Sequence, residues 1–298
     1  MKKVTKILLI VAAVCAVLGL GLFAAGTAMG GAQIGIETVR EAASRINPGQ
    51  SRFFRKMVFL GDWGDRTDWD EHHPDGVALS TMSDDGQGVR EYEIDAAVRQ
   101  MELNLEYDQL ELVPWDAEGI HVKVENDRNR QVEVALDGDC LEIAANEKEK
   151  NRKITVSYPE EQEFDSVEIY MGAGEVIING ALSARELEAE VGAGIFESRG
   201  KITVRSAGLE VGAGQMSISC MDAEEIEGEC GLGEIQLCLT GTAEQYNFDL
   251  ECGLGQISVG NDRYSSDASE HHSEHEGAGK RVSLECGMGE IEVSFQGQ

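Results

Sequence analysis

Apolar and polar residues alternate along much of the chain after residue 98. Stretches such as MELNLEYDQLELV, IHVKVEN, QVEVAL, CLEIAA and KITVSYP place polar residues at every second position, and Asp, Gly, Asn or charged residues separate them. A period of two is typical of half-buried β-strands, and no helix-length pattern intervenes. The pattern therefore predicts an all-β domain over residues 98–298.

A repeated segment fills the second half of this domain. The first glycines of its six copies lie 20, 20, 19, 22 and 34 residues apart, and the copies are YMGAGEVIING, EVGAGIFESRG, EVGAGQMSISC, ECGLGEIQLCL, ECGLGQISVGN and ECGMGEIEVSF. A period near 20 residues is too short for a helix pair or a propeller blade and suits one turn of a β-solenoid. We expect a single-stranded β-solenoid (β-helix) in which each copy, here called a rung, is a strand, a glycine corner and a second strand.

The G-x-G of each rung is interpreted as this corner. A dinucleotide-binding loop would need G-x-G-x-x-G between a strand and a helix, once in the fold, whereas these glycines recur six times before strand patterns. Glycine suits a corner because it adopts positive φ and lets stacked backbones approach closely. The corner glycines are Gly172, Gly174, Gly192, Gly194, Gly212, Gly214, Gly231, Gly233, Gly253, Gly255, Gly287 and Gly289.

Three cysteines share one position of the rung. Cys230, Cys252 and Cys286 stand directly before the motif, where earlier rungs carry Met171, Val191 and Val211. A position shared with Met and Val is expected to face the core, and stacked rungs would place neighbours about 4.8 Å apart. Buried free thiols are the first interpretation, followed by one strained inter-rung disulfide and then by a metal site. A metal is the last because one ligand per rung does not provide the four tetrahedral ligands that zinc needs.

A glutamate precedes five of the motifs by two residues and is expected to point outward. The resulting ladder comprises Glu190, Glu210, Glu229, Glu251 and Glu285. The repulsion between neighbours about 5 Å apart in water is only about 0.8 kcal/mol and is screened by salt, so a solvated acidic face is the simplest interpretation. The functional alternative is loose binding of a divalent cation or of a cationic partner along the ladder.

Other segments carry weaker signals. The polar segment 262–281 between the last two rungs is expected to be a surface insertion loop; its His271 and His275 could share a helix face and hold a transition metal, but adventitious capture is commoner. No nucleophile elbow, zinc-protease motif or P-loop occurs in the sequence. We therefore expect no enzyme activity, no cofactor and no physiological metal, and a carbohydrate-active β-helix enzyme is the minority hypothesis.

The N-terminus predicts membrane attachment. After MKKVTK, an uncharged apolar run extends from Ile7 to about Met29, so that residues 1–29 form a cytoplasmic tip and a transmembrane anchor. A signal peptide cleaved after the small residues GTA is the alternative. Residues 30–97 are expected to hold a short juxtamembrane helix (36–46) and an irregular linker, and the bulk of this single-pass protein is expected outside the cytoplasm.

The charge narrows the classes of partner. The 298 residues have a formal net charge of −30, with 55 acidic and 25 basic residues. Nucleic acid is excluded as a partner, because its phosphates need Lys and Arg to neutralise them. A protein or cell-surface partner fits better, and nothing in the sequence favours a small-molecule ligand.

The rungs, the anchor and the approach strand YPEEQEFDSVEIYMGAG together resemble the bacterial putative-adhesin family, and NFDLECGLGQISV and SLECGMGEIEVSF carry the strongest likeness. The resemblance covers about residues 98–298 and implies a repetitive β-solenoid of Gram-positive envelope proteins, displayed at the cell surface as an adhesion or interaction module. Some relatives accompany envelope-stress signalling systems, which gives the alternative of a regulatory protein acting on a membrane partner. The family has no catalytic residues to carry over.

Overall fold

The computed structural model describes residues 74, 76–145, 151–266 and 269–296, all within the compact unit Asp68–Gln298. The predicted transmembrane anchor and juxtamembrane helix lie outside the described residues. Within the described ranges, no helix combines the length and the apolar composition that crossing a bilayer requires.

The described chain is all-β apart from one 3₁₀ turn. Its elements are β1 Val77–Ala78, β2 Ser83–Asp84, β3 Arg90–Ile94, β4 Gln100–Trp115, β5 Ile120–Glu125, β6 Val132–Asp137, β7 Cys140–Ala145, β8 Arg152–Pro159, β9 Glu163–Ile178, β10 Leu182–Thr203, β11 Ser206–Asp222, β12 Glu225–Leu239, η3 Ala243–Gln245, β13 Tyr246–Val259, β14 Asp262–Ser266, β15 Ser269–Ser273 and β16 Lys280–Phe295. The sheet thus begins before residue 98, because the short strands β1 to β3 fall in the stretch that the sequence indicated as linker.

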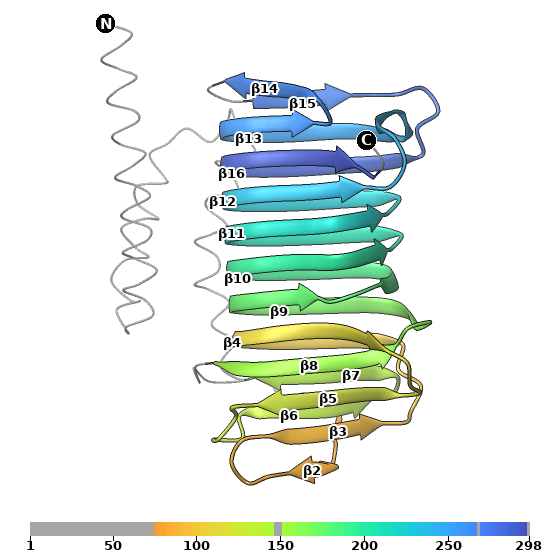
Figure 1. Ribbon diagram of the computed structural model, residues 1–298, viewed down its shortest axis with the longest axis vertical. Coiled ribbons are helices and arrows are strands. Elements are labelled where there is room, and N and C mark those ends of the chain that lie inside the picture. The colour runs from red at the N-terminus through yellow and green to blue at the C-terminus, as the bar shows by residue number, and fades with distance from the viewer. Residues whose placement is uncertain (1–73, 75, 146–150, 267–268, 297–298) are drawn as a thin grey trace, which may run out of the picture. The chain divides into compact units, whose positions relative to one another are not determined.

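The long strands stack into one mixed, mostly parallel sheet (Figure 1). The order along its parallel part is β4, β9, β10, β11, β12, β16 and β13, each strand hydrogen-bonded to the next. Each of these strands bends at its middle, and at both ends of the stack the residues before the bend (the first half) and after it (the second half) pair with different strands. The two halves thus form two faces around a shared core.

The core lies where the alternation placed it. The position directly before the motif pairs in register from strand to strand and is at most 2% exposed throughout the column Met171, Val191, Val211, Cys230, Cys286 and Cys252. β10 carries Phe196 and Ser198 where its neighbours carry aliphatic or Met residues, and both side chains are nevertheless buried. The Ser198 hydroxyl donates to the carbonyl of Gly200 at 2.9 Å. The inward positions expected from the sequence are confirmed.

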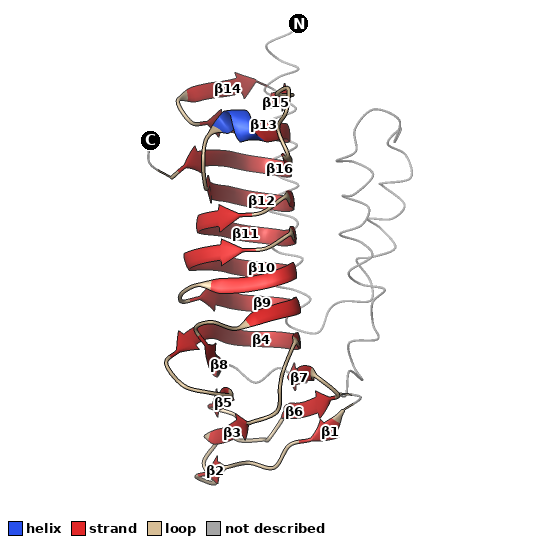
Figure 2. Ribbon diagram, turned by 90° about the vertical axis from the view of Figure 1, so that its right-hand side faces the viewer, coloured by secondary structure: helices blue, strands red, loops and turns tan. Residues whose placement is uncertain are grey.

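Antiparallel strands close both ends of the parallel stack (Figure 2). At one end, β7 and β8 pair with the two halves of β4, and β6 and β5 then pair antiparallel with β7 and β8. At the other end, β14 and β15 pair antiparallel with the second and first halves of β13. The segment expected to be an insertion loop therefore contains a pair of strands, which covers the edge that β13 would otherwise expose.

The last rung occupies an unexpected place. β16 lies between β12 and β13 and pairs in parallel with both, although stacking in chain order would place it beyond β13. The insertion explains this arrangement, because β14 and β15 occupy the outer edge of β13 and leave only its inner edge for β16. Phe295 of β16 packs against Phe248 and Tyr246 of β13, with ring centroids 6.2 and 6.3 Å apart.

The corner depends on the second glycine of each motif. Gly174, Gly194, Gly214, Gly233, Gly255 and Gly289 have φ between 141° and 152°, a region that other residues rarely adopt. A Cβ added to Gly214 would lie 1.7 Å from the carbonyl oxygen of Gly194, and the same close approach recurs at the other five. The first glycines of the motifs have no positive φ.

A buried ion pair takes the place of the glycine corner at the base of this column. Asp108 of β4 pairs in register with Gly174 on one side and Arg152 of β8 on the other. The Arg152 guanidinium donates to both Asp108 carboxylate oxygens, Nε to Oδ1 at 2.7 Å and Nη2 to Oδ2 at 3.1 Å, and both side chains are 0% exposed. The backbone N–H groups of Glu106 and Tyr107 also donate to Asp108 Oδ2.

The substitution Gly214→Ala is expected to destabilise the domain by about 3 kcal/mol or more in urea unfolding, because the methyl group meets a backbone carbonyl and φ becomes strained. Gly208→Ala is the control: Gly208 lies in a strand, has no atom within 4 Å of an added Cβ and has no positive φ. Equal effects of the two substitutions would contradict the role assigned to the corner.

Breaking the buried ion pair with Arg152→Met is expected to cost about 3–5 kcal/mol, because the Asp108 carboxylate then stays buried without its counter-charge. The double variant Asp108→Leu/Arg152→Met should lose less than the sum of the two single variants. As a control, Arg205→Met removes the pair Arg205–Glu224, whose side chains are 71% and 69% exposed, and should cost under about 1 kcal/mol. Additive effects at Asp108 and Arg152 in a double-mutant cycle would refute this coupling.

Candidate functional site

The outward positions of the first halves form a strongly acidic surface, here called the acidic face. In each strand, three side chains point to this face because alternate residues face outward. They stand six, four and two residues before the first glycine of the motif. The parallel register places equivalent positions of neighbouring strands side by side, so they form three columns. The predicted ladder is one of these columns. Its members pair in the order Tyr170, Glu190, Glu210, Glu229, Glu285 and Glu251, and all six are half-buried.

The structure brings a second acidic column beside the first. It contains five carboxylates, Glu102, Glu168, Glu188, Glu227 and Asp249, interrupted by Gly208 and Ser283. The third column adds Glu186 and Glu225. These residues were not predicted from the sequence, because they do not recur at a fixed position in every copy of the motif. The signal was present within single strands, as in Glu186, Glu188 and Glu190, where acids occupy successive outward positions.

Positive charge is scarce on this face. At the outward positions of the three columns, as far as the structure describes them, Arg281 is the one basic residue. Other basic residues lie at the strand ends with acidic partners: Arg99 and Arg185 both contact Asp165, at 2.5 and 2.7 Å. Twelve carboxylates therefore share the acidic face with one guanidinium.

The second halves present a different surface. Their carboxylates alternate with side-chain amides: Gln109 donates to Glu175 at 2.8 Å and Gln256 to Glu290 at 2.9 Å. Arg199 contacts Glu197, and Lys153 contacts Glu111. This face is a mixed polar surface, so negative charge is concentrated on the first halves.

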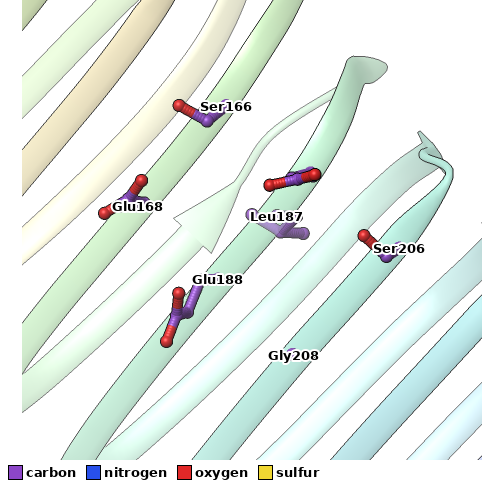
Figure 3. Close-up of a pocket in the computed structure, with 7 residues that line it drawn as sticks. Ser166, Glu168, Leu187, Glu188, Ser206 and Gly208 are labelled. Carbon is purple, nitrogen blue, oxygen red and sulfur yellow. The ribbon is translucent and has the colours of Figure 1, made fainter.

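A shallow depression indents the acidic face across β9, β10 and β11 (Figure 3). Its lining residues are Ser166, Glu168, Glu186, Leu187, Glu188, Ser206 and Gly208. Small residues cause the depression, because Ser166 and Ser206 flank Glu186, and Gly208 stands in the column beside Glu188. The hollow is open and lined mainly by carboxylates and serines, which suits contact with a cationic group.

Partial burial and neighbouring carboxylates both raise pKa values on the acidic face. The pKa of Glu168 is raised by partial burial and by the neighbouring charges of Glu102, Glu188 and Glu186. The pKa of Tyr170 is raised in the same way, by burial and then by Glu188, Glu168 and Glu190. Like charges at adjacent positions disfavour the ionised forms, so neighbouring carboxylates of this face repel one another at neutral pH.

The cysteine column contains three free thiols. Cys230, Cys286 and Cys252 are 1–2% exposed and occupy adjacent strands in that order. Each thiol lies beside a corner carbonyl of the neighbouring strand: Cys252 Sγ is 3.5 Å from Gly289 O, Cys286 Sγ is 3.7 Å from Gly233 O and Cys230 Sγ is 3.9 Å from Gly214 O. The buried, inward position expected for these residues is confirmed.

The remaining candidates do not assemble a reactive centre. His271 lies on the strand β15 rather than on a helix and stacks against Tyr264, with ring centroids 4.6 Å apart, while His275 Nδ1 contacts the Tyr246 carbonyl. Glu102, Cys140 and Glu142 bring three ligand atoms within 4.8 Å of one another. Burial and the surrounding carboxylates raise the pKa of Cys140 to about 11, so that its thiol stays protonated at neutral pH.

Comparison with known proteins gives a distant structural resemblance. No family model matches the chain, and no curated protein matches it. A crystal structure described as a putative cell adhesion protein from Clostridium sporogenes shares 12% identity, covers 70% of this chain and 100% of its own, and has a TM-score of 0.35. A putative adhesin from Bacteroides fragilis shares 13% identity with this chain, covers 69% of it and 95% of its own length, and has a TM-score of 0.32. A putative adhesin from Parabacteroides merdae shares 12% identity, covers 70% of this chain and 94% of its own length, and has a TM-score of 0.33.

The raised pKa of Glu168 generates a testable consequence. Its carboxyl is expected to titrate above the ordinary glutamate value in an NMR titration at low salt, and Glu188→Gln or added salt should lower that pKa by reducing the repulsion. Because the folded pKa exceeds the unfolded one, this group favours the folded state at pH values below the unfolded pKa, and the contribution is lost as pH rises through the folded pKa. Titration at or below the ordinary value would show that the face is not crowded.

Proposed function

We propose that this protein is a membrane-anchored, cell-surface β-solenoid that acts as a non-catalytic adhesion or interaction module and engages basic partners through its acidic face. The observation that carries the proposal is the concentration of twelve carboxylates and one guanidinium on one side of the stacked rungs. The β-solenoid architecture is inferred from the in-register parallel rungs and their bent middle.

Electrostatics supports a cationic partner. Each pair of neighbouring carboxylates about 5 Å apart repels by about 0.8 kcal/mol in water, and the repulsion grows where solvent is excluded. Lysine or arginine side chains placed along the columns would relieve this repulsion at several rungs at once. The regular rung spacing repeats the same weak contact, so affinity accumulates through the number of contacts rather than through one pocket.

A binding assay tests the acidic face. Fluorescent decalysine is expected to bind the wild-type chain at physiological salt and to bind Glu190→Gln/Glu210→Gln/Glu229→Gln about tenfold more weakly, since each exposed ion pair contributes about 0.2–1 kcal/mol. The matched control, Glu175→Gln/Glu234→Gln/Glu290→Gln, removes the same charge from the second halves and should change affinity less than about twofold. Equal losses in the two variants would show that net charge, and not this face, governs binding.

The location is tested separately. Protease treatment of intact cells that express the full chain should release fragments from residues 98–298 if this part is displayed outside. If only lysed cells yield these fragments, surface display is wrong, whatever the binding assay shows.

A further inference from the structure

The column of three thiols is the feature that the proposed function leaves unused. Cys230, Cys286 and Cys252 occupy directly neighbouring parallel strands, β12, β16 and β13, at the same position of the rung. Each strand pair is in register, so adjacent Cα atoms lie about 4.8 Å apart. That separation falls within the range of about 4.4–6.8 Å that a disulfide spans.

The order of the strands decides which thiols can meet. Cys286 is the register partner of both Cys230 and Cys252, whereas Cys230 and Cys252 are separated by an intervening strand. The latter two Cα atoms are therefore about 9–10 Å apart, beyond the reach of a disulfide. Chain order would have given the opposite expectation, with Cys252 in the middle.

The thiols also lean in one direction. Cys286 Sγ lies against Gly233 O of β12 and Cys252 Sγ against Gly289 O of β16, so these two sulfurs point toward a strand that carries a neighbouring cysteine. Cys230 Sγ leans the same way, toward Gly214 O of β11, so the Cys230–Cys286 bond requires the Cys230 side chain to turn toward β16. The thiols of Cys230 and Cys252 both interact with that of Cys286, which lowers their pKa values. The central residue is thus coupled to both neighbours.

We propose that this column is a disulfide-forming site in which Cys286 bonds to either Cys230 or Cys252 and so ties β16 into the sheet. A row of three thiols forms one such bond at a time and leaves the third as a free thiol. Because all three are 1–2% exposed, the bond forms while β16 docks and is shielded afterwards.

The oxidant is a small-molecule disulfide, and the exchange balances. A thiolate of one cysteine attacks the small disulfide, forms a mixed disulfide and releases one small thiol. Cys286 or its neighbour then attacks the mixed disulfide and releases the second small thiol. The two protein thiols lose two electrons and two protons in total, and one small disulfide is reduced to two thiols.

The test uses the full chain with Cys15→Ala, Cys140→Ser, Cys220→Ser and Cys238→Ser, so that only the column remains. The reduced protein is refolded with reduced and oxidised glutathione, its remaining thiols are alkylated after unfolding, and peptides are mapped by mass spectrometry. We expect one internal disulfide per chain, either Cys230–Cys286 or Cys252–Cys286, and one alkylated thiol. A Cys230–Cys252 bond, or no internal bond in the folded protein, would overturn the proposal.

Replacing each of the three cysteines singly by valine tests which one is essential. Valine is chosen because Val191 and Val211 occupy the same position in β10 and β11. Cys286→Val should abolish the internal disulfide, whereas Cys230→Val and Cys252→Val should each keep one. Circular dichroism confirms folding of each variant. If Cys286→Val does not fold, the bond identified in the parent still decides the matter. An internal bond that survives Cys286→Val in the folded protein would refute the central role of this residue.

Discussion

The close approach of stacked backbones at the corner is the constraint on which the rest of the architecture depends. The second glycine of each motif lies directly over the carbonyl of the rung beneath, with no room for a Cβ. This contact fixes where every strand bends, and the bend sets which residues face inward on both halves. The parallel register then follows, because a rung displaced by one residue would place a side chain against that carbonyl. Core packing and the surface columns both derive from this geometry.

The ends of the stack require other interactions, because a terminal copy of the repeat would leave an unpaired strand edge. Where the glycine column stops, the Asp108–Arg152 pair satisfies the polar groups of the corner, and antiparallel strands cover the sheet beyond it. A second buried pair lies further out, where the Arg90 guanidinium contacts Asp127, donates to the Val132 carbonyl at 2.8 Å and reaches the Tyr92 hydroxyl. Charged residues are thus buried at one end of the domain and at least partly exposed along its side.

Much of the domain could be predicted from the sequence, because the repeat shows which residue types are tolerated at the same structural position in six copies. Interchange of Met, Val and Cys identified the inward column, and the recurring Glu identified an outward one. Features that occur once could not be predicted. Asp108 and Arg152 are 44 residues apart, and no local pattern identifies them as partners, because only the pairing of β4 with β8 brings them together. The place of β16 was missed for a related reason. Near-identical rungs are interchangeable in sequence, so the order is decided by the polar segment between them.

The position of β16 also has a consequence for synthesis. A repeat that stacks in chain order can lengthen as it emerges, one rung at a time, and remain well formed wherever it stops. Here β13, β14 and β15 precede β16 in the chain, although β16 lies between β12 and β13 in the sheet. The sheet is therefore incomplete until residues 280–295 have been synthesised. A chain interrupted before that point would expose the edges of β12 and β13. Only a chain that contains β16 therefore presents an uninterrupted acidic face.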